Sequence, residues 1–207
     1  MTLSLQLAAT GAVLTLTLAL GACAIDDAEG GRPGVGSAGS AISSRDCPEG
    51  VPPELAPAPD QDLAFVLAAT GVQKYTCSAT ATGAAWTLVA PDAALFKNRH
   101  RVGTHDAGPT WRYRDGSSVV AAKAADATPD ASAIPWLLLT ATGHGGERGK
   151  MTAVTSIQRL STTGGRAPAA GCDADHMGAA SDVPYSADYF FYQTRTRHDE
   201  HNVRCGQ

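Results

Sequence analysis

The sequence predicts an all-β domain, an antiparallel β-sandwich or barrel of about eight short strands stapled by disulfide bonds. Three observations lead to this prediction. From Gln61 onward, apolar residues recur at every second position in short runs, which is the period of a half-buried strand. Glycine, proline or an Asp-Gly pair separates these runs. Beyond Ile25, no stretch has the apolar period of a long helix, so a helical or mixed fold is disfavoured.

The predicted elements follow one another along the chain with a turn signal at most boundaries. Gly71 is expected to turn the chain between the first two strands, and Pro91 is expected to end the third, before a short helical turn. Asp115-Gly116 predicts a type I′ hairpin turn, and Pro135 is expected at the start of a central strand. The predicted strands span residues 62–70, 72–79, 84–90, 110–114, 117–124, 133–143, 150–162 and 187–194.

The first residues have the pattern of a bacterial export signal. No charged side chain occurs from Met1 to Ile25, and Leu20-Gly21-Ala22-Cys23 resembles a lipobox, the cleavage motif of lipoproteins. We therefore expect residues 1–22 to be a lipoprotein signal peptide, with a diacylglycerol on Cys23 and a further acyl chain on its new amino group. The Lys or Arg usual near the start of a signal peptide is missing. An uncleaved membrane span is the alternative.

Two regions follow the signal. Residues 23–46 are rich in Gly, Ala and Ser with few bulky apolar side chains, so they are expected to be a flexible tether. Residues 47–207 are expected to form a single β domain. Ala24, rather than Asp, after the lipid cysteine resembles the outer-membrane sorting pattern. The predicted location is therefore the cell envelope, with a lipid anchor, in the outer membrane if the source has one.

Charge and motifs exclude several function classes. The net charge is −4 and no acidic or basic block occurs, so the sequence predicts no nucleic-acid partner. No Gly-x-Ser-x-Gly elbow, HExxH motif or P-loop is present, no GxGxxG opens a helix after a predicted strand, and no cofactor is predicted. Partners are expected to be the membrane, through the lipid, and a carbohydrate, a peptide or another envelope protein.

A series of motifs carries a family resemblance. In chain order they are GVQKYTC, HDAGPTW, DGSSVV, AIPWLLL, VTSIQRLSTTGG, PAAGCD and VPYSADYFFY. Their order and spacing are similar to those of domain of unknown function 3455, a family of exported bacterial and fungal proteins, over about residues 61–192. The resemblance implies a common fold and export but no activity, because the family is uncharacterised. Some fungal relatives carry a dehydrogenase label, which finds no support here because no GxGxxG opens a helix after a strand. Asp106 departs from the pattern, because an aromatic residue usually stands there.

The cysteines beyond Cys23 predict two disulfides, because an even number in an exported chain is typical of a disulfide framework. Four cysteines allow three connectivities. Cys77 and Cys172 both lie inside the family-like motifs, so the common fold is expected to pair them. Cys47 and Cys205 lie outside the motifs at the two ends of the domain, where chain termini are often close in space. The predicted pairs are Cys77–Cys172 and Cys47–Cys205.

The densest set of chemically capable residues lies in the stretch from 103 to 117. Gly108-Pro109 is expected to turn the chain and to present His105 beside Trp111 in a pocket. His105 with Asp115 is the catalytic candidate, since a histidine with a carboxylate can act as a base. The structural alternative gives each residue a packing or turn role, with His105 hydrogen-bonded to a backbone group. His105, Asp106, Trp111 and Tyr185 are the predicted binding residues, with the aromatic rings suited to stacking on a sugar or peptide.

No metal site is predicted. The weak candidates are His198 and His201, which form an HxxH pair, but two ligands alone do not make a metal site.

The sequence leaves two hypotheses about function. The first is a lipid-anchored envelope protein that acts as a binding or interaction module. The alternative is an envelope hydrolase or metal-dependent enzyme centred on His105 and Asp115. An enzyme requires that histidine, carboxylate and a further polar group converge in one cleft.

Overall fold

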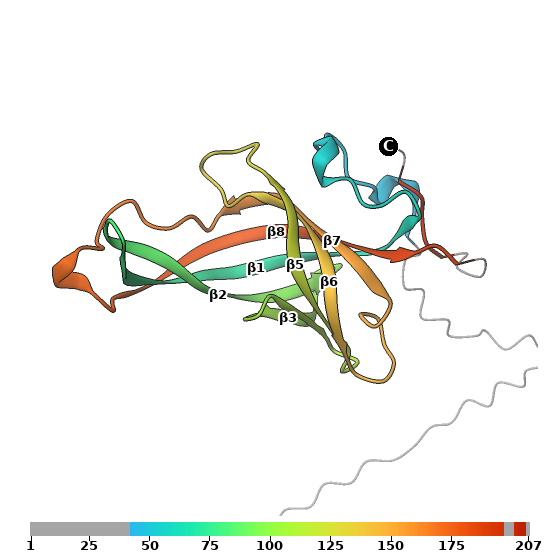
Figure 1. Ribbon diagram of the computed structural model, residues 1–207. Coiled ribbons are helices and arrows are strands. Elements are labelled where there is room, and N and C mark those ends of the chain that lie inside the picture. The colour runs from blue at the N-terminus through green and yellow to red at the C-terminus, as the bar shows by residue number, and fades with distance from the viewer. Residues whose placement is uncertain (1–41, 197–200, 206–207) are drawn as a thin grey trace, which may run out of the picture. The chain divides into compact units, whose positions relative to one another are not determined.

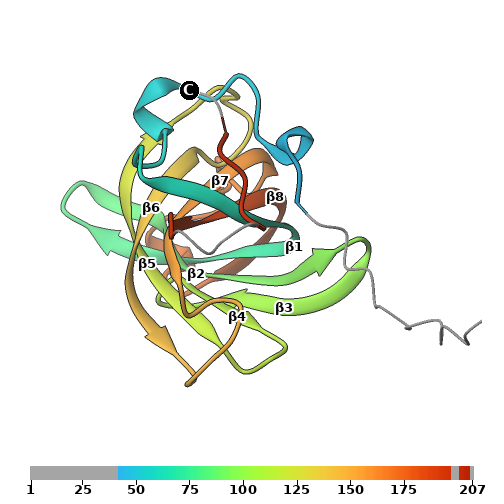
Figure 2. The same ribbon diagram turned by 90° about the vertical axis from the view of Figure 1, so that its right-hand side faces the viewer.

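Eight antiparallel strands form one closed barrel in which each strand pairs with its chain neighbours and β8 pairs with β1 (Figures 1 and 2). The computed structural model describes residues 42–196 and 201–205. The predicted signal peptide, Cys23 and His198 lie outside these residues. The strands are β1 (Gln61–Thr80), β2 (Gly83–Lys97), β3 (His100–Asp106), β4 (Thr110–Tyr113), β5 (Ser118–Ala127), β6 (Trp136–Gly145), β7 (Val154–Gly164) and β8 (Ala180–Thr194). The short 3₁₀ turns are η1 (Ser44–Asp46), η2 (Pro53–Leu55) and η3 (Ala174–His176).

The prediction of an all-β antiparallel fold is confirmed, and the barrel is the form it takes. Several strands are much longer than expected, since β1 has 20 residues and β2 and β8 have 15 each. These three strands run on beyond the shorter ones as a ribbon, visible on the left of Figure 1. Among the described residues, no helix is long and apolar enough to cross a membrane.

Gly71 does not turn the chain, and this prediction is wrong. β1 continues through Gly71, which pairs with Ala93 of β2 and Tyr185 of β8. A Cβ atom at this position would overlap the carbonyl oxygen of Asp92 and the Cα of Ala93. The glycine therefore marks a close approach of two strands inside a sheet rather than a turn.

The predicted stop at Pro91 and the helical turn after it are also wrong. Pro91 lies within β2 and pairs with Gln73. The register shifts beside it, because Lys74 pairs with Ala90 while Tyr75 pairs with Leu88. A bulge is one of the few places where a sheet tolerates proline, so β2 bends here and continues to Lys97.

Two turn positions are confirmed, and one turn type is wrong. The chain reverses between β4 and β5 at Asp115-Gly116, and Pro135 immediately precedes β6. The turn is not of type I′, which requires positive φ at both central residues, because Gly116 has φ of 86° but Asp115 does not have positive φ. The Gly116 N–H donates to the Tyr113 carbonyl at 3.0 Å, so the tight turn starts at Tyr113. Asp115 accepts hydrogen bonds from the backbone N–H of Ser117 at 2.9 Å and of Lys150 at 2.8 Å. The turn is therefore tied to the loop between β6 and β7.

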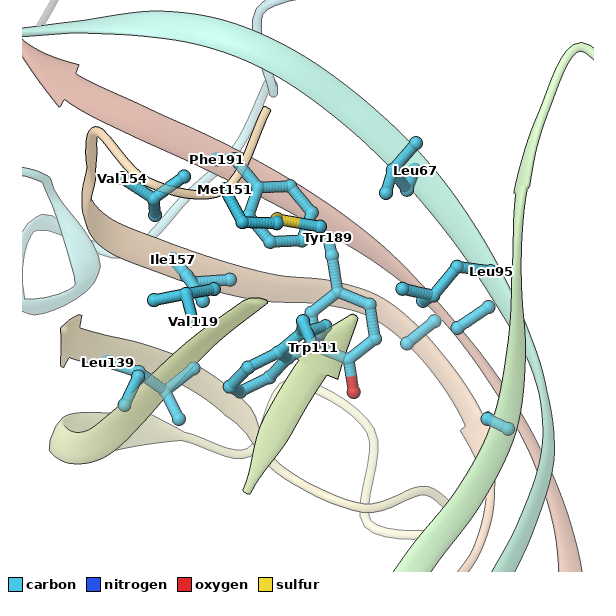
Figure 3. Packing of buried hydrophobic residues seen from close by; sticks show 14 of the residues in the cluster. Leu67, Leu95, Trp111, Val119, Leu139, Met151, Val154, Ile157, Tyr189 and Phe191 are labelled. Carbon is cyan, nitrogen blue, oxygen red and sulfur yellow. The ribbon is translucent and has the colours of Figure 1, made fainter. Parts of the chain in front are cut away.

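Alternating residues of the strands fill the barrel, and eight strands leave an interior just wide enough for side chains or one small ligand. Figure 3 shows this core, whose fully buried members include Phe65, Leu67, Leu95, Trp111, Ile157, Tyr189 and Phe191. Burial of each large side chain contributes about 1.5–3 kcal/mol to stability. A register shift between Leu63 and Phe65 puts these two residues on opposite faces of β1.

A second apolar cluster lies on the outside of the barrel, where the segment before β1 packs against it. It comprises Leu55, Leu63, Leu160, Phe190 and Tyr192. Disulfide Cys47–Cys205 ties both ends of the domain together beside this cluster, and Cys77–Cys172 ties the loop before β8 to the β1 ribbon. Both pairs are those predicted from the sequence. Each closes a long loop, which in a chain-entropy model stabilises the fold by roughly 4 to 5 kcal/mol.

Candidate functional site

A pocket of about 380 Å³ enters the barrel at the end where the β3–β4 turn and the segment before β6 lie. Its volume is within the range of small-molecule sites. Most of the wall is apolar, with a few polar side chains from six strands. The lining residues are Gln73, Leu88, Val89, Ala90, Pro91, His105, Gly108, Pro109, Trp111, Lys123, Asp126, Pro135, Leu137, Leu139, Arg159 and Tyr189.

Three aromatic rings form one side of the pocket, two of them stacked and the third edge-on. His105 and Trp111 are direct cross-strand partners in the β3–β4 hairpin, so their side chains lie on the same face. Their ring centroids are 4.2 Å apart and the planes differ by 10°. Tyr189 meets both edge-on, at 5.3 Å from His105 and 5.4 Å from Trp111. Figure 3 shows the Tyr189 ring beside Trp111. The sequence prediction that the Gly108-Pro109 turn presents His105 beside Trp111 matches this arrangement.

His105 is held in its neutral form. Burial lowers the pKa of His105 to about 4, because the imidazolium loses its hydration inside the barrel. Nδ1 lies 3.0 Å from the carbonyl oxygen of Thr110. A carbonyl only accepts hydrogen bonds, so Nδ1 carries the proton and Nε2 keeps its lone pair.

Two buried polar atoms in the pocket wall have no hydrogen-bond partner among the described residues. They are the Nε2 amide of Gln73 and the Nε1 indole of Trp111, on side chains that are 2% and 1% exposed. The hydroxyls of Tyr189 and Tyr185 do not belong with them, because the two tyrosines, and Arg159 with Tyr189, lie close enough for side-chain hydrogen bonds that oppose the rise in the pKa of Tyr189 caused by burial. A buried polar group without a partner costs about 1–3 kcal/mol. A molecule in the pocket with matching polar atoms would remove this cost.

Arg159 brings a positive charge to the pocket. It follows Ile157 by two positions on β7, so its side chain lies on the face that points into the barrel. Its Nε and Nη2 donate to the carbonyl oxygen of Pro135 at 3.1 and 2.8 Å. No carboxylate pairs with Arg159 in the part of the chain that the structure describes.

The pocket mouth is apolar and exposed. Leu88 and Val89 sit beside the β2 bulge with 52% and 61% of their surface accessible, unusually high values for large apolar residues in this barrel. Two further lining residues, Lys123 and Asp126, form an exposed ion pair at 2.6 Å. An exposed apolar rim around a hollow is typical of a binding site.

The structure separates the other predicted site residues from this pocket. Asp106 is half-buried and accepts a hydrogen bond from Arg112 at 3.2 Å. Asp115 occupies the β4–β5 turn and does not line the pocket, so His105 and Asp115 do not share a cleft there. Tyr185 is buried in the barrel core. His201 is exposed, and no cluster of three or more His, Cys, Asp or Glu suited to a metal occurs in residues 42–196 and 201–205.

Sequence reasoning missed Gln73, Arg159 and Tyr189 as pocket residues. Each lies at an inward position of a strand, on the same face as apolar core residues. The available signal was the alternation itself, because a polar or charged residue at an inward position must find a partner. The alternation did not show which end of the barrel would be open.

Comparison with known proteins identifies the family of the chain. A family model described as a protein of unknown function, DUF3455, matches residues 57–193. The chain belongs to the DUF3455 family. The match contains β1 to β7 and nearly all of β8, with every pocket residue and the Cys77–Cys172 disulfide. Cys47 and Cys205 lie outside it. No curated protein matches this DUF3455 chain, and no solved structure does.

Proposed function

We propose that this DUF3455 protein is a lipid-anchored binding protein of the cell envelope, whose barrel holds a small organic molecule in the pocket beside His105 and Trp111. The observation that carries the binding role is the set of buried donors without partners, at Gln73 Nε2 and Trp111 Nε1, in the wall of an apolar pocket. A ligand would complete these hydrogen bonds while covering the aromatic wall.

The envelope location rests on two features. The lipobox-like residues before Cys23 are followed by a Gly-, Ala- and Ser-rich segment suited to a tether. Two disulfides are typical of a protein that folds in an oxidising compartment. A binding protein on a lipid tether would meet its ligand in the space next to the membrane.

The enzyme hypothesis has less support. The Nδ1 of His105 is occupied by a backbone carbonyl, so no carboxylate orients this ring. Asp115 is engaged by backbone N–H groups in a turn outside the pocket. Binding without reaction is therefore the function that the geometry favours.

The indole N–H of Trp111 supplies the test. In a ¹H–¹⁵N spectrum of the purified protein, the three tryptophans each give one indole signal, assigned by single Trp→Phe variants. Titration with the neutral probe 3-phenylpropanol is expected to move the Trp111 signal in a saturable way. The Trp86 signal is the internal control, because Trp86 Nε1 donates to the Ala170 carbonyl at 3.0 Å outside the pocket.

Two matched variants locate the binding. Ala90→Phe adds a ring to a lining position of β2, whereas Ala85→Phe adds the same ring to an exposed position of the same strand. The Trp111 shift is expected to disappear in the first variant and to persist in the second. A Trp111 signal that stays fixed up to the solubility limit of the probe would refute the proposed pocket.

A further inference from the structure

The charged residues of the pocket identify the kind of ligand. Three of its lining residues carry charge, namely Lys123, Asp126 and Arg159. Lys123 and Asp126 neutralise each other in an exposed ion pair. His105 is neutral, since burial lowers its pKa. The pocket therefore presents one net positive charge, on Arg159.

Arg159 is fixed in place by the segment before β6. Its two bonds to the Pro135 carbonyl use only part of a guanidinium with five N–H groups. The Pro135 carbonyl is held firmly, because the preceding residue, Ile134, is bonded on both sides. The Ile134 N–H donates to the Gly164 carbonyl at 2.9 Å, and the Ile134 carbonyl accepts from the Thr162 hydroxyl at 2.6 Å. A fixed guanidinium with free donors is a good receptor for a planar anion.

The unpartnered atoms of the wall are also donors. Gln73 Nε2 and Trp111 Nε1 can donate but not accept, and both belong to side chains at least nine-tenths buried. Their best partner is a molecule rich in acceptors, and an anion is richer in acceptors than any neutral group of its size. The aromatic and aliphatic wall requires that the rest of the molecule be apolar.

We infer that the ligand is a small organic acid, with an apolar or aromatic body along the His105–Trp111 wall and a carboxylate bound by Arg159. This inference rests on the proposed function and adds the chemical class of the ligand to it. A single unopposed guanidinium matches the single charge of a carboxylate, whereas a phosphate dianion would leave half of its charge unbalanced.

The test compares three probes of nearly the same shape, 3-phenylpropanoate, 3-phenylpropanamide and 3-phenylpropylammonium, by isothermal titration calorimetry of the purified protein. The carboxylate is expected to bind at least about tenfold more tightly than the amide, because a charge-assisted hydrogen bond is about twice as strong as a neutral one. The ammonium is expected to bind most weakly. Inorganic phosphate is expected not to compete with the carboxylate.

Variants assign the preference to one residue. Arg159→Gln is expected to lower the affinity for 3-phenylpropanoate to that for 3-phenylpropanamide. Arg112→Gln is the matched control, because it removes the same charge from an exposed position outside the pocket and should keep the preference. If Arg159→Gln does not fold, as judged by circular dichroism, the comparison of carboxylate with amide on the unmodified protein decides the matter.

The outcomes separate this inference from the proposed function. Equal binding of acid and amide, or a preference that survives Arg159→Gln, overturns the inference while the binding pocket stands. Competition by phosphate at similar concentration overturns the carboxylate class. If none of the three probes moves the Trp111 indole signal, the proposed function itself is contradicted.

Discussion

The imidazole of His105 lies parallel to the indole of Trp111, with 4.2 Å between the ring centroids, and both rings are almost completely buried. A histidine in such a place cannot be charged without losing hydration that the barrel does not replace. Burial disfavours the protonated imidazole more than the attraction of a cation to the Trp111 ring favours it. The pKa of His105 therefore falls to about 4. This relationship links the stability of the barrel to pH.

Stability is expected to fall in mild acid because of His105. Between pH 6.5 and about 4 the unfolded chain binds a proton at this residue while the folded chain does not, so lower pH favours unfolding. The contribution of His105 is fully present above pH 6.5 and on the order of 3 kcal/mol of it is lost by pH 4. Urea unfolding at pH 7 and pH 4.5 measures it.

The pH effect has a simple control. His105→Phe keeps a ring on Trp111 but removes the titration, so this variant should lose less stability between the two pH values than the unmodified protein. His100→Gln, at an exposed position, should lose as much as the unmodified protein. An identical pH dependence for His105→Phe would show that His105 does not carry the effect.

Asp115 is expected to be a stability residue. Its carboxylate joins the β4–β5 turn to the β6–β7 loop, and the Ser117 and Lys150 hydrogen bonds oppose its desolvation and hold its pKa below the usual value. Asp115→Ala is expected to lower the free energy of unfolding by about 1–2 kcal/mol. Asp126→Ala removes an exposed ion pair and should cost less than about 1 kcal/mol. Equal losses in chemical denaturation would contradict this role.

Gly71 is expected to tolerate no side chain. Gly71→Ala places a methyl group against the backbone of Asp92 and Ala93, so β1 and β2 must separate, at a cost of about 3 kcal/mol or more. Gly143→Ala is the matched control in β6, where nothing lies within 4 Å of an added Cβ. Melting temperatures compare the two variants. A Gly71→Ala protein as stable as Gly143→Ala would refute the close approach.

The proposed lipid anchor makes a prediction of its own. When the full chain is expressed in a bacterial host, the mature protein is expected to begin at Cys23, to carry acyl mass there and to partition into detergent. Cys23→Ser should abolish the acyl mass and either release the protein or leave the precursor uncut. Mass spectrometry of the N-terminal peptide decides this. A different mature N-terminus without acyl mass would contradict the anchor.

Features of the fold that depend on local chemistry could be predicted from the sequence, whereas those that depend on strand pairing could not. The strand alternation and the place of the Asp115-Gly116 turn depend on local chemistry, and both were predicted correctly, although the turn is not of the predicted type I′. Gly71 and Pro91 were misjudged because each is a strong turn signal locally, yet lies in a long sheet where β-sheet pairing overrides it. β3 was missed because its run holds two histidines and an arginine among few apolar residues.

The pocket was only half predictable. His105 and Trp111 lie on the two strands of a hairpin whose turn is predicted by Gly108-Pro109, so their proximity could be predicted from the sequence. Gln73 and Arg159 come from strands far away in the chain, and only closure of the barrel brings them to the same hollow. Asp115 has the right chemistry for a catalytic partner, but its place at the far end of the hairpin was not visible from residue type.

Binding of an organic acid beside Arg159 can be seen in a crystal structure of the protein soaked with 3-phenylpropanoate. We expect electron density for the probe inside the barrel, with its ring against the Trp111 wall and a carboxylate oxygen within about 3 Å of the Arg159 guanidinium. The Gln73 amide or the Trp111 indole is expected to donate to the same carboxylate. A pocket without the probe, or a probe whose carboxylate points away from Arg159 to the solvent, would contradict this binding.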